Sequence, residues 1–96
     1  MKPHYFVYIM TNARQTVLYT GVTGNLMQRV FNHRTLAIPG FTSRYNVDKL
    51  VFYEEHATSA SAIAREKQIK AGPRRRKVAL IDSINPDWQD LYEDLL

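Results

Sequence analysis

Two short runs rich in β-branched and aromatic residues constrain the fold of this chain more than any other feature. The runs are Tyr5–Met10 and Thr16–Thr20, and the short polar segment Thr11–Gln15 separates them. Runs of this composition are typical of strands, and a connection this short joins strands that run antiparallel. The sequence therefore predicts a β-hairpin near the start of the chain.

A helix, a long loop and a third strand are expected after the hairpin. Residues 23–25 (Thr-Gly-Asn) offer helix-capping groups, and Leu26–Arg34 follows with helical spacing of its apolar side chains. Residues 35–47 are rich in Pro, Gly, Ser, Thr and Asn and are expected to form a long loop, a kind of segment that is often functional in compact domains. Lys49–Tyr53 is the predicted third strand.

The second half of the chain is predicted to be helical. Thr58–Ser59 caps a helix that runs to about Ala71, where Gly72–Pro73 stops it. A third helix is expected over Arg74–Ile84. Asn85–Pro86 fits an N-cap followed by proline at the first helical position, and so predicts a last helix. The side chains expected to face inward are Val78, Ile81 and Ile84 in the third helix and Trp88, Leu91, Tyr92 and Leu95 in the last.

The order β-β-α-β-α-α-α predicts an α+β fold with a small, three-stranded, mostly antiparallel sheet flanked by helices. With 96 residues, positions 1–96 are expected to form a single domain. The absence of cysteine excludes disulfides, thiolate zinc sites and thiol nucleophiles. No apolar run approaches the ~20 residues of a membrane span, and the first residues do not resemble a signal peptide. We therefore expect a soluble cytoplasmic protein with no membrane association and no obligate protein partner.

Positive charge is concentrated outside the C-terminal end. The net charge is +4, but the first 86 residues hold 13 basic and 5 acidic residues, a net of +8, because four acids lie in the last ten positions. A basic body suits a polyanion such as nucleic acid, since each neutralised phosphate releases counterions. The run Arg74–Lys77 at a helix start can grip a phosphate backbone. The alternative is a solvated surface with an excess of arginine.

Arg29 and His33 lie one helical turn apart beside the apolar stripe marked by Leu26 and Val30. Arginine suits a phosphate because its planar fork stays charged and bonds two oxygens at once. Histidine takes or gives a proton near neutral pH. The pair faces either a cleft or solvent, and an exposed pair without a role is the alternative.

Glu66 interrupts the apolar stripe of the second helix, between Ile63 and Ile69. A carboxylate on a half-buried face is costly unless it is paired with a cation or coordinates a metal. Magnesium commonly takes one or two protein carboxylates and completes its shell with water and substrate phosphate. The alternative is a structural salt bridge, to Arg29 or Lys49.

Two tyrosines lie on the predicted hairpin. Strand alternation puts Tyr8 on one face together with Phe6 and Met10. The alternative to a functional role is packing, which is common for tyrosine in a strand. Tyr19 comes two residues before Gly21, which indicates a bend or a close approach of the backbone. Each of these observations is weak by itself.

In this order, these residues resemble the GIY-YIG nuclease superfamily, and more narrowly its small stand-alone members. Phe6–Tyr8 occupies the first motif and Tyr19–Gly21 the second, with ten residues between the two tyrosines. Arg29 and His33 match the arginine of the family's helix and the His or Tyr one turn later, and Glu66 matches its metal-binding glutamate. The sequence departs from the motifs by having Phe6 in place of glycine, and Val7 and Thr20 in place of isoleucine.

The resemblance implies a metal-dependent endonuclease that hydrolyses phosphodiester bonds in DNA, with weak sequence specificity or structure-guided choice, in DNA repair or recombination. It implies Mg²⁺ or Mn²⁺ held by Glu66, and one tyrosine, Tyr8 or Tyr19, that orients or deprotonates the attacking water with help from His33 or a positive charge. Arg29 would stabilise the charge that grows on the phosphate. The residues expected to contact nucleic acid are Arg34, Arg44, Lys49, Arg74, Arg75, Arg76 and Lys77.

Two other classes of function stay open. A non-catalytic nucleic-acid-binding module would have the same basic surface and an inert site. A scaffold would act through the acidic C-terminal helix, and this reading rests on the acids from Asp87 to Asp94 alone.

Overall fold

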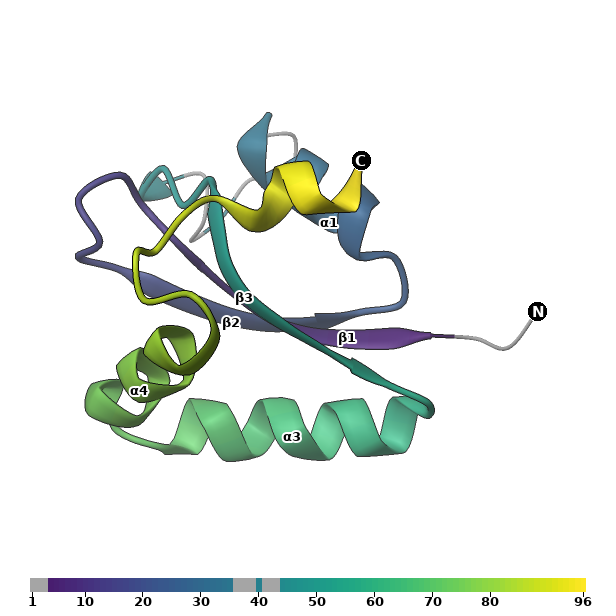
Figure 1. The fold of residues 1–96 in the computed structure, drawn as a ribbon. Coiled ribbons are helices and arrows are strands. Elements are labelled where there is room, and N and C mark those ends of the chain that lie inside the picture. Colours follow the sequence, from purple (N-terminus) through teal and green to yellow (C-terminus); the bar gives the residue numbers. More distant parts are fainter. Residues whose placement is uncertain (1–3, 36–39, 41–43) are drawn as a thin grey trace.

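The computed structural model describes residues 4–35, 40 and 44–96, and in them a three-stranded antiparallel sheet lies between two layers of helices (Figure 1). The central strand β1 pairs with β2 on one side and with β3 on the other. The predicted α+β architecture is confirmed. The elements are β1 (Tyr5–Thr11), β2 (Leu18–Thr23), α1 (Leu26–Arg34), β3 (Lys49–His56), α3 (Ser59–Ala71), α4 (Arg74–Ile84) and the 3₁₀ helix η1 (Leu91–Leu95).

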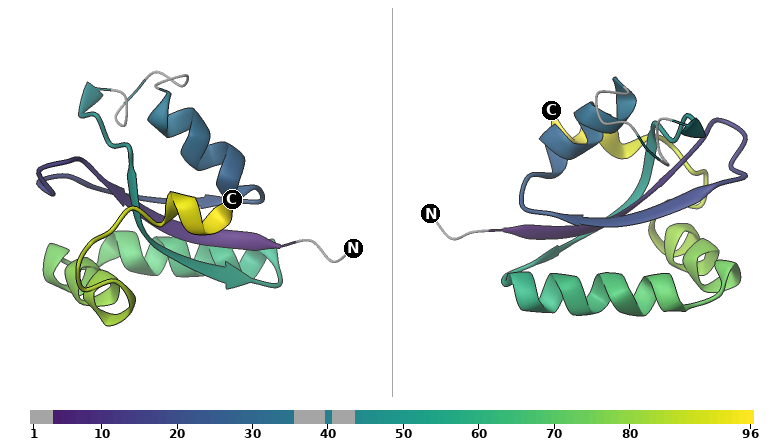
Figure 2. Two further views of the ribbon diagram at one scale, coloured as in Figure 1. Left: turned by 45° about the horizontal axis from the view of Figure 1, so that its top comes forward. Right: turned by 180° about the vertical axis from the view of Figure 1, so that it is seen from behind.

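Side chains that alternate along β1 give the sheet two buried faces. Tyr8 and Met10 pack with α1 and η1 on one face, which we call the upper face, and Val7 and Ile9 pack with α3 and α4 on the other, the lower face. All four side chains are fully buried. Figures 1 and 2 show the two helical layers from different sides. The predicted alternation along this strand is confirmed, and a mainly apolar strand is explained by burial on both faces.

Local capping groups set the ends of the helices close to the predicted positions. The Asn25 side chain accepts a hydrogen bond from the Gln28 N–H group at 3.2 Å and so begins α1. The Thr58 hydroxyl accepts one from the Ser61 N–H group at 3.1 Å and so begins α3. Each cap satisfies a backbone donor that has no partner inside the helix.

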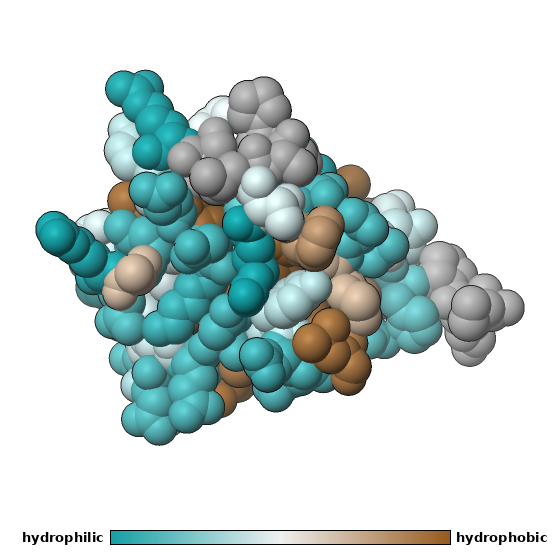
Figure 3. All heavy atoms as spheres, turned by 90° about the horizontal axis from the view of Figure 1, so that it is seen from above, coloured by the Kyte–Doolittle hydropathy of each residue, from teal (hydrophilic) through white to brown (hydrophobic). Residues whose placement is uncertain are grey.

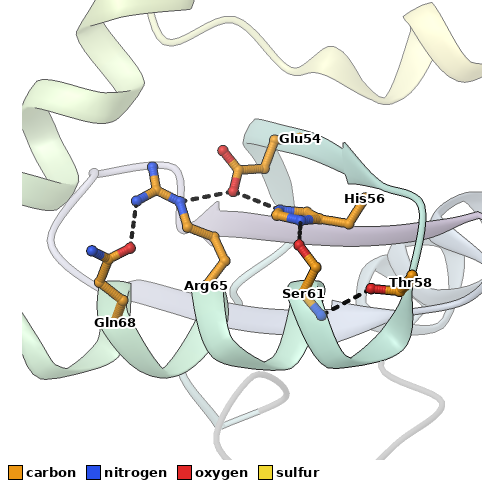
Figure 4. Close-up of polar contacts among 6 residues, drawn as sticks. All are labelled: Glu54, His56, Thr58, Ser61, Arg65 and Gln68. Carbon is orange, nitrogen blue, oxygen red and sulfur yellow. Dashed lines mark hydrogen bonds and ion pairs between the residues drawn. The ribbon is translucent and has the colours of Figure 1, made fainter.

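A chain of polar contacts fastens α3 to the end of β3 (Figure 4). The His56 ring contacts the Ser61 hydroxyl at 2.7 Å through Nδ1 and the Glu54 carboxylate at 2.9 Å through Nε2. Arg65 donates from Nε to the same Glu54 oxygen at 2.8 Å and from Nη1 to Gln68. These contacts fix which side of α3 lies toward β3.

The prediction of a last helix that begins at Asn85–Pro86 is wrong. Asn85 instead ends α4, and its buried amide donates to the carbonyl oxygens of Val51 at 3.1 Å and Gln89 at 2.8 Å. Trp88 has a φ angle of 52°, which a helix cannot contain. The chain therefore turns back across the sheet, and only the short η1 follows.

Three further expectations are corrected. The second strand covers Leu18–Thr23, because the Asn12 side chain accepts hydrogen bonds from the N–H groups of Thr16 and Val17 and holds these residues in the turn. Ile84, expected to face inward, is 55% exposed. The third strand continues to His56, beyond its expected end. Much of the predicted loop 35–47 lies outside the described residues, and none of the helices in the described ranges is long and apolar enough to cross a membrane.

Candidate active site

Tyr8 lies at the centre of the sheet, and Gly21 makes room for its ring. The two residues are opposite each other in the pairing of β1 with β2. A Cβ atom added to Gly21 would lie 2.5 Å from both Cζ and the hydroxyl oxygen of Tyr8. A glycine at this position therefore allows the Tyr8 side chain to lie across β2 on the upper face.

The rings of Tyr8, Tyr19 and His33 meet on the upper face. The Tyr8 hydroxyl is 3.1 Å from Nε2 of His33. The ring centroids are 6.2 Å apart between the two tyrosines, 6.0 Å between Tyr8 and His33, and 5.4 Å between Tyr19 and His33. Tyr8 and His33 are buried and Tyr19 is half-buried. The predicted meeting of the hairpin tyrosines with the histidine of α1 is thus what the structure contains.

The electrostatic environment keeps Tyr8 and His33 uncharged. Burial raises the pKa of Tyr8 to about 12, although the Arg29 guanidinium opposes this shift. Burial, and then the positive charge of Arg29, lower the pKa of His33 below its ordinary 6.5. At neutral pH a protonated phenol therefore faces a neutral imidazole, so we assign Tyr8 as the donor and Nε2 of His33 as the acceptor of their hydrogen bond.

Arg29 belongs to the same group of residues, one turn before His33 on α1. Its effect on the pKa values of both Tyr8 and His33 shows that its guanidinium lies close to them. The side chain is half-buried, and its Nε atom is buried without a hydrogen-bond partner in the described part of the chain. Because Nε is buried, an anion such as a phosphate would meet the guanidinium only where the half-buried side chain is accessible.

Glu66 is in a different layer from these four residues. It lies on α3, whose buried side chains Ala62 and Ile69 pack on the lower face. Its side chain is 13% exposed, and its carboxylate pairs with Lys70 at 3.1 Å, rather than with the Arg29 or Lys49 partner that the sequence suggested. Ile63, expected in the same stripe, is 42% exposed.

The contacts of Arg65 indicate which edge of the sheet Glu66 approaches. Arg65 and Glu66 flank the stripe formed by Ala62 and Ile69, and Arg65 reaches toward β3 to bind Glu54. Glu66 therefore lies on the opposite flank of the helix, toward β2, which carries Tyr19 on its other face. Among the described residues, no group of three or more His, Asp or Glu side chains is arranged to hold a metal ion.

The basic residues expected to contact nucleic acid fall into two groups. Arg34 and Lys49 line a hollow beside α1, where Arg34 pairs with Asp90. Arg44 lies over the ring of Tyr45 at 5.6 Å.

The second group lies at the start of α4, in the layer of the lower face. Arg74 donates to the carbonyl oxygens of Gln15 and Thr16 in the hairpin turn. Lys77 donates to the Gly72 carbonyl at 2.8 Å, and Arg76 and Lys77 line a cavity of about 320 Å³ between α3 and α4. Arg75 is exposed.

Asp90 is a residue that the sequence analysis did not single out. Its carboxylate accepts hydrogen bonds from Arg34, from the Leu50 N–H group at 3.2 Å and from the Tyr92 N–H group at 3.0 Å. The sequence shows it as one of several acids near the C-terminal end, and no local pattern distinguishes it from the others.

Several known proteins are similar to this chain in sequence. The sequence profile described as the GIY-YIG catalytic domain matches residues 4–78. A UPF0213 protein of Natronomonas pharaonis is 32% identical over 81 residues, which cover 84% of this chain and 94% of that protein. A UPF0213 protein of Clostridium perfringens is 35% identical over 78 residues, or 81% of this chain and 83% of that protein.

A solved structure shares the fold. The solution NMR structure of a UPF0213 protein from Bacillus halodurans has a TM-score of 0.58 and 22% sequence identity, and the match covers 91% of this chain and 92% of that one. The matched profile spans Tyr8, Tyr19, Arg29, His33 and Glu66. By its sequence and its fold, this chain belongs to the GIY-YIG family and is similar to the UPF0213 proteins.

Proposed function

We propose that this protein is a metal-dependent endonuclease that hydrolyses phosphodiester bonds in DNA. The observation that carries the proposal is the half-buried Arg29 guanidinium, which lies beside the buried Tyr8–His33 pair. A preorganised cation of this kind stabilises negative charge better than a solvated one, because little reorganisation is needed when that charge develops. Membership of a family of catalytic domains supports the same conclusion.

The two tyrosines have different parts in the proposal. Tyr8 is fully buried, so its hydroxyl cannot meet substrate without a rearrangement. Because burial raises the pKa of Tyr8 and lowers that of His33, transfer of the Tyr8 proton to His33 is unfavourable. We therefore assign the attacking water to the half-buried Tyr19, which would orient it, and a positioning role to the Tyr8–His33 pair.

Arg29 would bind a non-bridging oxygen of the scissile phosphate. The planar fork holds two oxygens in a fixed direction, which lysine cannot do. Because His33 is neutral, it does not repel the guanidinium of Arg29 beside it. His33 and Tyr8 thus position the residues of the site, and Arg29 supplies its positive charge.

Glu66 is the residue proposed to hold Mg²⁺ or Mn²⁺. The Glu66 side chain is 13% exposed, while that of its partner Lys70 is 52% exposed and on the same helix. A surface pair of this spacing contributes only about 0.3–0.5 kcal/mol, which offsets little of the cost of burying a carboxylate. A single carboxylate suits magnesium if water and substrate phosphate complete the shell. When bound, the ion would neutralise charge on the leaving oxygen.

The positive charge of the chain favours DNA as the substrate. The first 86 residues have a net charge of +8, and attraction to phosphates does not itself read base sequence. We propose weak sequence specificity or a choice guided by DNA structure, and a role in DNA repair or recombination. A non-catalytic nucleic-acid-binding module is the alternative.

A cleavage panel tests the proposal. Duplex, single-stranded and branched DNA would be incubated with Mg²⁺, Mn²⁺ or EDTA. Cleavage by the wild type is expected with the metals only. Arg29→Lys should lower the single-turnover rate by roughly 10²-fold while it preserves most of the DNA affinity, because the charge remains but the fork is lost. Binding without cleavage under every condition would identify the binding module instead.

Matched variants separate the site from general effects. Tyr19→Phe should impair cleavage, whereas Tyr53→Phe, on a half-buried tyrosine of β3, should not. Arg14→Lys, in the exposed hairpin turn, is the control for Arg29→Lys. Glu66→Gln should weaken Mn²⁺ binding measured by calorimetry in the absence of DNA, and unchanged Mn²⁺ affinity would remove Glu66 as the metal ligand.

A further inference from the structure

The C-terminal segment (residues 85–96) passes from the lower layer, where Trp88 packs, to the upper face beside α1, and puts Asp90 at a convergence of donors. The Arg34 guanidinium donates to one carboxylate oxygen at 2.5 Å. The Leu50 N–H group at the start of β3 donates to the other oxygen at 3.2 Å. The Tyr92 N–H group adds a third hydrogen bond to that second oxygen, at 3.0 Å. Arg34 and Leu50 are more than 15 positions apart in the chain, so the fold and not a local turn brings them together.

These donors open onto a hollow of about 270 Å³ beside the end of α1. Its lining comprises the cations Arg34 and Lys49, the acids Asp48 and Asp90, and Ala13. Two positive and two negative side chains leave the hollow without net formal charge. Without the Asp90 charge it would be positive.

The ion pair between Arg34 and Asp90 is accessible to competing anions. The Arg34 side chain is 37% exposed and the Asp90 side chain 32% exposed. Ion pairs at this exposure are weak, because water and salt compete for both partners. The Arg34 guanidinium also lies 4.6 Å from the Tyr92 ring centroid, so a ring of the same segment holds its fork in place when an acceptor changes.

We propose that Arg34, Lys49 and the Leu50 N–H group form a phosphate-binding subsite, which Asp90 occupies in cis as a carboxylate stand-in for phosphate. Carboxylate and phosphate oxygens accept the same charge-assisted hydrogen bonds from an arginine fork and a backbone donor. The ligand is a phosphate group of the nucleic-acid backbone, so the inference rests on the proposed function. Asp90 competes with that phosphate and limits contact along this side of α1.

The surroundings of the subsite favour this competition. The C-terminal segment contains four acidic residues and no lysine, arginine or histidine. Seen from above, the face that carries α1 and η1 is largely hydrophilic (Figure 3). An acidic segment beside a cationic helix repels a phosphate backbone on one flank and leaves the flank toward β2 and Tyr19 accessible. Asp90 thus helps to set the direction in which a strand crosses the upper face.

A double-mutant cycle tests the subsite. Affinity for DNA would be measured against salt concentration with Ca²⁺ replacing the cleavage metal. Asp90→Asn should raise the affinity and steepen the salt slope by about 0.9 on duplex DNA, the effect of one added phosphate contact. Arg34→Ala should leave the DNA affinity of the wild type nearly unchanged. In the Asp90→Asn background it should cancel the gain in affinity.

The control is Asp87→Asn, which removes the same charge from an exposed position of the same segment. Asp87→Asn should give a smaller gain in DNA affinity, and this gain should not depend on Arg34. A gain from Asp90→Asn that equals this control, or one that persists with Arg34→Ala, would overturn the subsite. So would a large loss of affinity for Arg34→Ala in the wild-type background, a measurement that stands even if Asp90→Asn fails to fold.

A parallel titration with inorganic phosphate, followed by NMR at the Leu50 amide, separates this inference from the proposed function. Arg34-dependent phosphate binding by Asp90→Asn without any DNA binding would keep the subsite and refute the nuclease. DNA cleavage by the wild type with no Arg34-dependent gain in either titration would keep the nuclease and refute the subsite.

Discussion

At the scale of single residues, the candidate site depends on Gly21, which has no side chain. The Tyr8 ring occupies the space that a Cβ atom of residue 21 would need, at 2.5 Å from Cζ. We expect Gly21→Ala to lower the free energy of unfolding by about 1–3 kcal/mol, the usual cost of overpacking a buried contact. Urea unfolding measures this change.

Gly24→Ala is the matched control for this substitution. The nearest atom to a Cβ at residue 24 is Cε1 of Tyr5, at 4.0 Å, which is an ordinary contact. The control should leave stability within about 0.5 kcal/mol of the wild type. Equal effects of the two alanines would show that backbone freedom, rather than the Tyr8 ring, requires glycine.

The buried His33 predicts a loss of stability in mild acid. Its folded pKa is lowered by burial and by Arg29, while an unfolded histidine has a pKa of about 6.5, so the unfolded chain takes up a proton first. The stabilisation is complete above that pH and is lost as the pH falls from 6.5 through the folded pKa. His33→Gln does not titrate, so its unfolding free energy should fall less below pH 6.5.

Denaturant unfolding from about pH 5 to pH 8, over the range in which histidine titrates, compares the two proteins. The difference in unfolding free energy between the wild type and His33→Gln should become smaller as the pH falls. Parallel curves would show that His33 has an ordinary pKa and that burial and Arg29 do not hold it neutral.

Sequence alone predicted the residues whose meeting depends on short-range geometry. Tyr8 and Tyr19 come together because one hairpin joins them, and Arg29 and His33 because one helical turn separates them. The pairing of Arg34 with Asp90 could not be predicted, since 56 positions separate these residues and several other acids lie nearby.

At the scale of elements, the predicted boundaries were accurate where the capping group lies next to the helix. α1 begins after Asn25 and α3 after Thr58, both of which cap through their own side chains. The last helix was wrong because Asn85 bonds to Val51, on a strand 34 positions away. A preference for an N-cap could not compete with that tertiary contact.

Asn85 is therefore expected to hold the C-terminal segment on the sheet. Asn85→Ala leaves the Val51 and Gln89 carbonyl groups and the Gln89 N–H group without this partner, so we expect a loss of about 1–3 kcal/mol in unfolding free energy. Fluorescence of Trp88, the one tryptophan in the sequence, should report the transition and a more solvated ring in the native state.

Asn32→Ala provides a control on the surface of α1. The Asn32 side chain accepts a hydrogen bond from Gln28 within the same helix, where alanine is the better helix former. The control should be nearly neutral. A similar loss for both variants would mean that the bond to Val51 contributes nothing particular to the stability of the segment.

At the scale of the whole molecule, the candidate site and the basic run at the start of α4 lie in different layers of the fold, and Figure 2 shows these layers from two sides. The Tyr8–His33 pair and Arg29 are on the upper face, and Arg74–Lys77 begins α4 in the lower layer. Arg74 binds the carbonyl groups of the hairpin turn, so the start of α4 lies next to that turn. A phosphate backbone that leaves the upper face around this turn would reach Arg75.

This path predicts a separation of binding from chemistry. Arg75→Ala should reduce the slope of log affinity against log salt by about 0.9 on duplex DNA, because one phosphate contact is lost. The single-turnover rate at saturating DNA should not change, since Arg75 lies away from Arg29. Lys67→Ala removes the same charge from an exposed position on α3 and should leave the slope unaltered. Equal changes in the two slopes would mean that DNA senses only the net charge, whereas a fall in the rate for Arg75→Ala would place the start of α4 at the reacting phosphate.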